Sequence, residues 1–504
     1  MISDKNFSNI LSSHAALTPD KIYCKKINGR SVTFAELDVF VNQCCFFLQS
    51  QNIGYGDTLT INIHNSISSI ILYIAAIRSG IKINPSPSTL SESELIKHVT
   101  YIKSNMVISS LDLKDNHLNY NFSYVKFIDD NKFINEISSF CTDQFEQNIN
   151  ININDVACIY YSSGTTGSSK YVLYSHKNMV SLTESLVQTF HFTSNTKHLG
   201  VLPLGHTAII NYQFLPTLYI GGTLYLAENF NQIRNNVWKI ISDYEIDYLQ
   251  LVPTLIFAML ATKYDEADYS LNKTLSYIGC GSAPLSTESQ IKFYEKFNIN
   301  VANLYGLSES GPSHFDDPRL TDWQPGSIGT PLGVNDCKIL DKNFVELKVG
   351  EVGQIALKGD NIFIGYYKNV EMYKKSFFEN YFLTGDVGYK DETGKFYFSD
   401  REKDIIIKAG VNIVPGEIEE IIFKLPDVQS AAVVGIPDEY FGETIIAFIQ
   451  KSNESLKEDE IMNILVENLQ PLKMPSKIIF VDSMPVGPSG KILKRKLRED
   501  LINE

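Results

Sequence analysis

A run of small residues at positions 160–170 constrains this chain more than any other feature. The run reads YYSSGTTGSSK and overlaps the end of an apolar stretch, residues 156–161, that predicts a buried β-strand. Glycines let backbone N–H groups approach an anion, hydroxyls donate further hydrogen bonds, and a lysine adds a positive charge. We therefore expect a phosphate-binding loop directly after a strand. Its candidate ligands are Ser162, Ser163, Gly164, Thr165, Thr166, Gly167 and Lys170.

This loop differs from the Walker A motif, because Gly164 and Gly167 are three positions apart and no Ser or Thr follows Lys170. A flexible Ser/Gly linker is the alternative interpretation. Linkers seldom lie against a buried strand, so we favour a phosphate loop of another type.

Apolar residues in the N-terminal half predict the sheet around this strand. They recur at helical spacing in residues 34–50 and 68–77, and short strands are expected at 58–63 and 105–109. This alternation predicts an α/β sheet covered by helices. At 504 residues the chain is too long for one compact core, so we expect at least two domains.

The C-terminal third has a different pattern. Residues 350–404 are rich in Gly, Tyr and Phe and contain a turn signal at 391–394, which predicts short strands and hairpins. Residues 415–481 then alternate between helix-like and strand-like segments. They predict a separate α+β unit of roughly 100 residues at the end of the chain.

Charge and cysteine usage limit the partners. The chain has 44 Lys plus Arg against 58 Asp plus Glu, and its formal charge of −14 disfavours nucleic acid and anionic membranes. The apolar residues 70–77 stop at Arg78, before they could span a bilayer. The seven cysteines lack CxxC spacing, so neither a zinc site nor a disulfide framework is expected. These features predict a soluble, cytoplasmic protein with small-molecule partners.

Four later segments contain residues suited to a nucleotide, although each motif is weak alone. They read GCGSAPL at 279–285, NLYGLSE at 303–309, YFLTGDVG at 381–388 and SDREKD at 399–404. A turn capped by Ser286 is the alternative for the first, a surface turn for the second and a solvated charge cluster for the last. The third contains Asp386, whose carboxylate can accept two hydrogen bonds from a ligand.

Together with the phosphate loop, these segments resemble the adenylate-forming superfamily of acyl- and aryl-CoA synthetases, peptide-synthetase adenylation domains and firefly luciferase. The resemblance covers nearly the whole chain. It implies an α/β fold, with a large N-terminal domain of α/β sheets plus a β-rich subdomain and a small, mobile α+β C-terminal domain. It also implies ATP, Mg²⁺ and a thiol acceptor, which is either coenzyme A or the phosphopantetheine of a separate carrier protein.

The resemblance implies roles for individual residues. Tyr305 would stack on adenine, Ser308 would touch phosphate, and Glu309 would bind the metal at the catalytic centre. Asp386 would hold the ribose hydroxyls, and Arg401 would contact the nucleotide. The remaining nucleotide-site candidates are Gly281, Ser282, Ala283, Asn303 and Gly306.

The family's moving and catalytic groups match residues near the C-terminus. Lys403 matches the hinge, which divides the chain into domains 1–402 and 403–504. Lys491, in the segment 485–493 that reads PVGPSGKIL, matches the catalytic lysine that bridges the carboxylate and the α-phosphate.

Further matches concern the acid and the thiol. His206 falls where acyl- and aryl-CoA synthetases carry a histidine or aromatic residue beside the carboxylate pocket, and a buried, satisfied histidine is the alternative. Lys408 and Gly410 would lie on the acceptor side, where Gly410 permits pantetheine to pass close to the backbone. Ile407 departs from the pattern, because many relatives have a lysine there.

We therefore expect a ligase that converts a carboxylic acid and MgATP to acyl-AMP and pyrophosphate, then transfers the acyl group to coenzyme A. Loading of a carrier protein is the alternative among enzymes, and a non-catalytic nucleotide-binding protein is the alternative of another class. The acid pocket is expected at residues 206–214, 251–258, 277–281 and 302–311, whose mostly apolar or small side chains suit an aryl or medium aliphatic acid.

Overall fold

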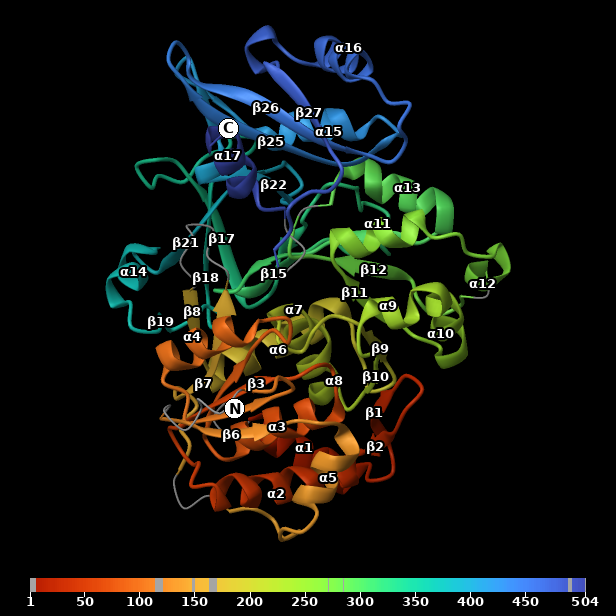
Figure 1. Ribbon diagram of the computed structural model, residues 1–504, viewed down its shortest axis with the longest axis vertical. Coiled ribbons are helices and arrows are strands. Elements are labelled where there is room, and N and C mark those ends of the chain that lie inside the picture. The colour runs from red at the N-terminus through yellow and green to blue at the C-terminus, as the bar shows by residue number, and fades with distance from the viewer. Residues whose placement is uncertain are drawn as a thin grey trace.

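The computed structural model describes residues 6–113, 121–146, 150–162, 170–270, 272–283, 285–487 and 492–503. Figure 1 shows a large part and, above it, a small blue part that contains the C-terminus. The large part holds two seven-stranded sheets and a β-rich region, and the small part holds one five-stranded sheet. The expected fold class, mixed α/β with a large N-terminal domain and a smaller C-terminal domain, is confirmed.

The strands that flank the predicted phosphate loop belong to the first seven-stranded sheet. Its order is β19-β8-β7-β4-β3-β5-β6, in which the pairs from β7 to β6 are parallel and β8 is antiparallel to both neighbours. Two strands expected from the sequence are present as β3 (Thr58–Asn62) and β5 (Met106–Ser109). The others are β4 (Lys82–Pro85), β6 (Ser123–Lys126), β7 (Val156–Ser162), β8 (Lys170–Ser175) and β19 (Gly365–Tyr366).

Helices predicted from apolar spacing pack beside this sheet. Helix α2 (Phe34–Ser50) packs on α3 (Ile67–Arg78), every residue of which is buried. Among the residues that the structure describes, no helix is both long and apolar enough to cross a membrane. The other helices of this region are α1 (Phe7–Leu17), α4 (Glu92–Ile102) and α5 (Asp130–Ile137).

The second seven-stranded sheet has the order β13-β12-β11-β9-β10-β1-β2 and is parallel except for the pair β1–β2. Its strands are β1 (Ile22–Lys26), β2 (Ser31–Thr33), β9 (Lys197–Gly200), β10 (Thr223–Leu226), β11 (Tyr248–Leu251), β12 (Tyr277–Cys280) and β13 (Asn300–Asn303). The α-helices along this stretch of chain are α6 (His176–Phe190), α7 (Thr207–Ile209), α8 (Leu215–Ile220), α9 (Phe230–Ile233), α10 (Val237–Tyr244), α11 (Pro253–Ala261), α12 (Glu266–Ser270) and α13 (Thr287–Phe297).

Between residues 305 and 401 the chain forms a three-stranded and a five-stranded antiparallel sheet, and the predicted β-rich stretch, residues 350–404, supplies four strands of the larger one. In the larger one, the expected hairpin joins β21 (Tyr381–Lys390) to β22 (Phe396–Arg401) and places Asp386 opposite Arg401. The remaining elements are β14 (Tyr305–Leu307), β15 (Gly311–Phe315), β16 (Thr330–Pro331), β17 (Asn335–Leu340), β18 (Gly353–Gly359), α14 (Val370–Lys375) and β20 (Phe377–Phe378).

The C-terminal part buries apolar residues on both faces of its sheet. Ala431 and Val433 of β25 (Val428–Asp438) belong to one apolar cluster, and the alternate residues Ala432 and Val434 belong to another. Helix α15 (Pro415–Phe423) covers the first face with α16 (Glu458–Asn468), and α17 (Lys494–Asn503) contributes to the second. The other strands are β23 (Ile406–Lys408), β24 (Val411–Ile413), β26 (Gly442–Lys451) and β27 (Lys477–Val481).

Candidate active site

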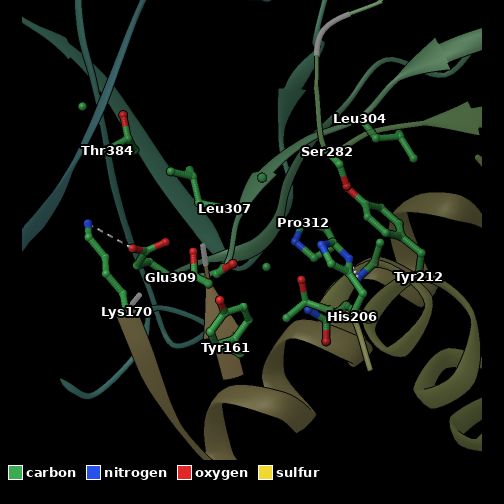
Figure 2. Close-up of a pocket in the computed structure, with 18 of the residues that line it drawn as sticks. Tyr161, Lys170, His206, Tyr212, Ser282, Leu304, Leu307, Glu309, Pro312 and Thr384 are labelled. Carbon is green, nitrogen blue, oxygen red and sulfur yellow. Dashed lines mark hydrogen bonds and ion pairs between the residues drawn. The ribbon is translucent and has the colours of Figure 1, made fainter. Parts of the chain in front are cut away.

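A cavity of about 290 Å³ is lined by residues of the first seven-stranded sheet, segments that follow strands of the second, the β-rich region and the segment that leads into the C-terminal part (Figure 2). Most of the chain segments selected from the sequence meet here. The predicted site residues that line the cavity are Ser162, Lys170, His206, Ser282, Gly306, Ser308, Glu309, Arg401 and Lys403.

Other predicted site residues are not part of this lining. Lys408 and Gly410 belong to the β23–β24 hairpin of the C-terminal part. Five more lie next to lining residues, namely Gly281, Ala283, Asn303, Tyr305 and Asp386. Six predicted residues lie outside the described residues, namely Ser163, Gly164, Thr165, Thr166, Gly167 and Lys491.

The two strands that bracket the predicted phosphate loop bring both of its ends to the cavity. Ser162, the last residue of β7, pairs with Lys170, the first residue of β8. The Lys170 ammonium group lies 3.8 Å from Glu309 Oε1 and 5.2 Å from the centre of the Tyr366 ring. Because this ion pair is long, the cation can also bind an anionic ligand in the cavity.

Glu309 is a buried carboxylate at the cavity wall. The Tyr366 hydroxyl donates to its Oε1 at 2.8 Å, and burial together with the charge of Glu309 raises the pKa of Tyr366, which keeps this donor protonated. Glu309 Oε2 accepts no hydrogen bond from any described residue. A carboxylate oxygen in this setting fits Mg²⁺, which is usually bound through one or two carboxylates with substrate phosphates and water.

Two glycines fix the turn that carries Ser308 and Glu309. This turn joins β14 to β15, and a Cβ at Gly306 would lie 2.3 Å from the carbonyl oxygen of Gly311. Gly311 itself has a φ of +61°, and a Cβ there would lie 2.4 Å from Leu182 Cδ2. The strands can approach this closely only without side chains at these positions, so the glycines determine where the carboxylate points.

Tyr305, Asp386 and Arg401 form a connected group next to the cavity. The Tyr305 hydroxyl donates to Asp386 Oδ2 at 2.8 Å, and Arg401 Nε lies 3.1 Å from Oδ1. Burial and the Asp386 charge raise the pKa of Tyr305, and the Asp386 charge raises the pKa of Arg401. The contact with Arg401 is an ion pair without hydrogen-bond geometry. Asp386 Oδ1 is buried and accepts no hydrogen bond from a described residue. The group therefore offers one acceptor that a ligand hydroxyl would satisfy.

The predicted adenine-side turn follows β12. Ser282 has a φ of +72°, which is uncommon for a residue other than glycine, and its side chain lines the cavity. Asn303 joins this turn to β13, because its amide accepts from Leu285 N at 3.3 Å and donates to Leu285 O at 3.2 Å. Asn303 thus holds the turn in place rather than facing the cavity.

His206 is half-buried at the cavity, at the start of a helical segment. Its Nδ1 accepts a hydrogen bond from Ala208 N at 3.2 Å and caps α7. In the neutral ring the proton is therefore on Nε2, which makes that nitrogen a donor. The preceding residue, Gly205, has to be a glycine, because a Cβ there would lie 2.4 Å from the backbone oxygen of Ser86.

The C-terminal part contacts the end of β22 beside Lys403. Lys494 Nζ lies 2.9 Å from Glu419 Oε1 and 3.5 Å from Asp400 Oδ2, and Gly416 N donates to the same Asp400 oxygen at 3.1 Å. Burial alone would lower the pKa of Lys494, but Glu419 and Asp400 raise it above its usual value. This lysine is charged and connects both parts of the molecule.

Sequence reasoning missed several residues of the site. Thr384 lines the cavity and Tyr366 holds Glu309, and neither was among the predicted site residues. Asn211 and Tyr212 also line the cavity, and they lie within the predicted wall segment 206–214 without having been singled out. The pair at 211–212 had a signal, because polar residues interrupt an otherwise apolar helical segment. Two of the four expected wall segments, residues 251–258 and 277–281, do not line the cavity. The other two segments, residues 206–214 and 302–311, do contribute to the lining.

Comparison with known proteins agrees with this geometry. Residues 11–367 match the model of the AMP-binding enzyme family, and residues 417–491 match that of the AMP-binding enzyme C-terminal domain. The chain belongs to the AMP-binding enzyme family. Membership confirms the resemblance to adenylate-forming enzymes that the sequence motifs indicated.

Several AMP-binding enzymes are similar to this one over almost their whole length. The 2-succinylbenzoate–CoA ligase of Bacillus licheniformis is 29% identical, with 97% of this chain and 99% of the relative covered. A long-chain-fatty-acid–CoA ligase of Mycobacterium tuberculosis is 28% identical, with 98% of each covered. The crystal structure of ATP-bound MatB from Rhodopseudomonas palustris has a TM-score of 0.90 at 26% identity and covers 98% of this chain and 99% of its own.

Proposed function

We propose that this chain is an AMP-forming acid–thiol ligase that uses ATP and prefers coenzyme A as the thiol. The Tyr305–Asp386–Arg401 group carries this proposal, because Asp386 Oδ1, which pairs with Arg401 but accepts no hydrogen bond, lies next to a cavity lined by Lys170 and Glu309. An acceptor for a diol, a cation and a metal-binding carboxylate are the groups that a magnesium nucleotide requires. The CoA ligases among the relatives support the same reaction class.

Asp386 binds the ribose of ATP in this proposal. Its Oδ1 accepts one ribose hydroxyl, and the Tyr305 hydroxyl keeps Oδ2 oriented. Arg401 compensates the buried charge and faces the cavity, where it can also contact the nucleotide. Lys170 and the hydroxyl of Ser162 bind phosphate oxygens at the ends of the loop.

Glu309 would hold Mg²⁺ through Oε2, and the hydroxyls of Ser308 and Thr384 lie in the same lining. The metal would neutralise charge on the phosphates during transfer. Tyr366 keeps the carboxylate in position through its hydrogen bond to Oε1.

In the first step, the carboxylate of the acid attacks the α-phosphorus of ATP. A bond forms between carboxylate oxygen and phosphorus, the bond from phosphorus to the bridging oxygen breaks, and pyrophosphate leaves with the electron pair. His206 Nε2 donates to the acid carboxylate and orients it. The family's catalytic lysine, matched by Lys491, stabilises the charge that develops on the carboxylate and phosphate oxygens.

In the second step, the thiol loses its proton to solvent and its sulfur attacks the acyl carbon. The carbon–oxygen bond to AMP breaks, and AMP leaves. We assign this step to a second orientation of residues 403–504, reached by rotation about Lys403 at the boundary with residues 1–402. In that orientation Lys408 and Gly410 would approach the pantetheine.

Loading of a carrier-protein phosphopantetheine remains the alternative acceptor, since its terminal thiol has the same chemistry. The second candidate of another class, a non-catalytic nucleotide-binding protein, is disfavoured by the joint presence of Lys170, Glu309, Asp386 and Arg401 around one cavity. A reducing compartment such as the cytoplasm suits the seven cysteines, all of which are free thiols.

The direct test is acid-dependent exchange of labelled pyrophosphate into ATP, followed by addition of coenzyme A. Exchange that requires an acid, and acyl-CoA formed on addition of the thiol, are the expected results. Exchange without acyl-CoA would shift the acceptor to a carrier protein. Absence of exchange with every acid would reject the ligase in favour of the nucleotide-binding protein.

A further inference from the structure

An irregular helical turn forms one wall of the cavity. Residues Ile210–Phe214 are a π-helix between α7 and α8, so the chain gains an extra residue in this turn. Single π-turns of this kind occur frequently at functional sites, because they redirect side chains that a regular helix would bury elsewhere. Here the turn brings both Asn211 and Tyr212 to the cavity.

These two side chains are almost fully buried, at 4% and 5% exposure, yet neither makes a hydrogen bond to any described residue. The next residue behaves differently, because the Gln213 amide donates to Leu199 O at 2.8 Å and supports the sheet. Burial raises the pKa of Tyr212, so its hydroxyl keeps its proton and can donate. Both side chains line the cavity, so their polar groups can form hydrogen bonds with a ligand there.

Glycine leaves room for the amide beside the cavity. A Cβ at Gly311 would lie 3.1 Å from Asn211 Nδ2 and closer still to Leu182. Figure 2 shows the Tyr212 ring extending toward Ser282, with His206, Leu304 and Pro312 around it. The acid end therefore combines polar groups with a few apolar walls.

Aromatic rings pack against this end of the cavity. Behind Tyr212, the space below β11 and β12 is filled by aromatic rings, with ring centres 6.2 Å apart for Phe190 and Tyr212 and 5.8 Å apart for Tyr248 and Tyr277. A long alkyl chain would have to displace this aromatic packing.

The lysine and arginine side chains of the described lining are Lys170, Arg401 and Lys403. Lys170 pairs with Glu309 on the side of Figure 2 opposite Tyr212, and Arg401 pairs with Asp386. Beside Asn211 and Tyr212 a second carboxylate would meet two uncharged side chains, which favours an uncharged substituent there.

We infer that Asn211 and Tyr212 determine specificity for a compact carboxylic acid that carries an uncharged hydroxyl or oxo group. This inference rests on the proposed acid activation. The tyrosine hydroxyl donates to the oxygen of the substituent, and the asparagine amide can donate to it or accept from a hydroxyl.

The test compares acids that differ only by hydroxyl against methyl. Lactate is paired with isobutyrate, and 3-hydroxybutyrate and acetoacetate are paired with 3-methylbutyrate. Benzoate, octanoate and malonate represent aryl, alkyl and dicarboxylic acids. We expect kcat/KM for pyrophosphate exchange to be at least about 100-fold higher for a hydroxy or oxo acid than for its methyl partner, because the methyl group leaves the polar groups unpaired.

Two variants and one control assign this preference to the π-turn. Tyr212→Phe and Asn211→Leu should each reduce kcat/KM for the polar acid by about 10-fold or more while leaving its methyl partner and the KM for ATP nearly unchanged. Tyr225→Phe removes a hydroxyl from a half-buried tyrosine on β10 that packs on Tyr244 outside the cavity, and should change none of these values.

Each outcome bears on one claim. Fastest exchange with benzoate, octanoate, malonate or a methyl partner would overturn the inference while leaving the ligase in place, as would a polar preference that both variants retain. Should one variant fail to fold, the other still decides. No exchange with any acid would reject the proposed activity itself, and the inference with it.

Discussion

The contacts within the large part differ in kind from the contacts between the large part and the C-terminal part. Six clusters of buried apolar residues occur among the described residues, and none contains residues from both sides of position 403. Within the large part, one cluster runs through both seven-stranded sheets. Between the parts, the contacts noted above are polar, with Lys494 and the N–H of Gly416 both bonded to Asp400.

The two kinds of contact suit two different tasks, namely keeping the cavity walls in place and allowing the C-terminal part to move. Apolar packing over a large core is rigid, and it keeps the cavity walls in register. Polar contacts exchange for water at modest cost, which makes relative motion of domains the ordinary expectation. The large part therefore suits ligand positioning, and the small part suits a second orientation for the second half-reaction.

We expect the largest difference between the two parts in their loss of stability at acid pH. Burial lowers the pKa of His98 and His176 to about 4 and that of His198 and His314 to about 3, whereas all nine histidines of the chain precede position 315. Because these folded-state pKa values lie below the unfolded value of about 6.5, the stabilisation is present above pH 6.5 and is lost as the pH falls toward 4. At pH 5 each of these four buried histidines lowers the free energy of unfolding by about 2 kcal/mol.

The large part should therefore lose stability in this range before the C-terminal part does. Tryptophan fluorescence in urea at several pH values reports on the large part alone, because the two tryptophans, Trp238 and Trp323, both lie there. Hydrogen exchange followed by mass spectrometry reports on both parts. Equal acid sensitivity of residues 403–504 would contradict the comparison.

Removing the bridging cation is the next largest change. In Lys494→Met the partly buried Glu419 and the buried Asp400, 17% and 8% exposed at the side chain, lose their counter-ion, and we expect a loss of about 3–5 kcal/mol. Urea unfolding and hydrogen exchange at α15 and α17 measure it. The control is Arg495→Met on the same helix, whose side chain is 56% exposed and pairs with exposed Glu499, and whose loss should be below about 1 kcal/mol.

Within the large part, Asp386→Asn should weaken nucleotide binding without disturbing the acid. The amide keeps the size of the side chain but loses charge-assisted bonds worth about 1.5–3 kcal/mol, so kcat/KM for ATP should fall by roughly 10- to 100-fold. Steady-state pyrophosphate exchange at varied ATP and varied acid separates the two effects. An unchanged KM for ATP would remove Asp386 from the nucleotide site.

The smallest effect is expected for Glu420→Gln. This exposed residue accepts from Thr287 N at 3.4 Å across the two parts, a long bond at the surface. We expect a change below about 0.5 kcal/mol in urea unfolding, because exposed polar contacts contribute little. A larger loss would mean that docking is spread over the interface rather than concentrated at Lys494.

The nucleotide end of the site was accessible from the sequence because its residues lie in short, ordered motifs. Asp386 and Arg401, fifteen positions apart, meet simply because a hairpin folds β21 onto β22. At the acid end the sequence predicted the wall segment 206–214, but not that a π-turn brings Asn211 and Tyr212 to the cavity, since no apolar period predicts such a turn. The pairing of Asp400 with Lys494 joins residues 94 positions apart and depends on how two folded parts dock.

The tight β14–β15 turn also limits how the enzyme can evolve. At Gly306 even a methyl group would collide with the backbone of Gly311, so variation there would displace Ser308 and Glu309 together. Substitutions at Tyr212 or Asn211 act on side chains alone and leave this backbone untouched. In a lineage of such enzymes, substitutions in the π-turn can therefore change the specificity for the acid substrate, while the binding of ATP is inherited unchanged.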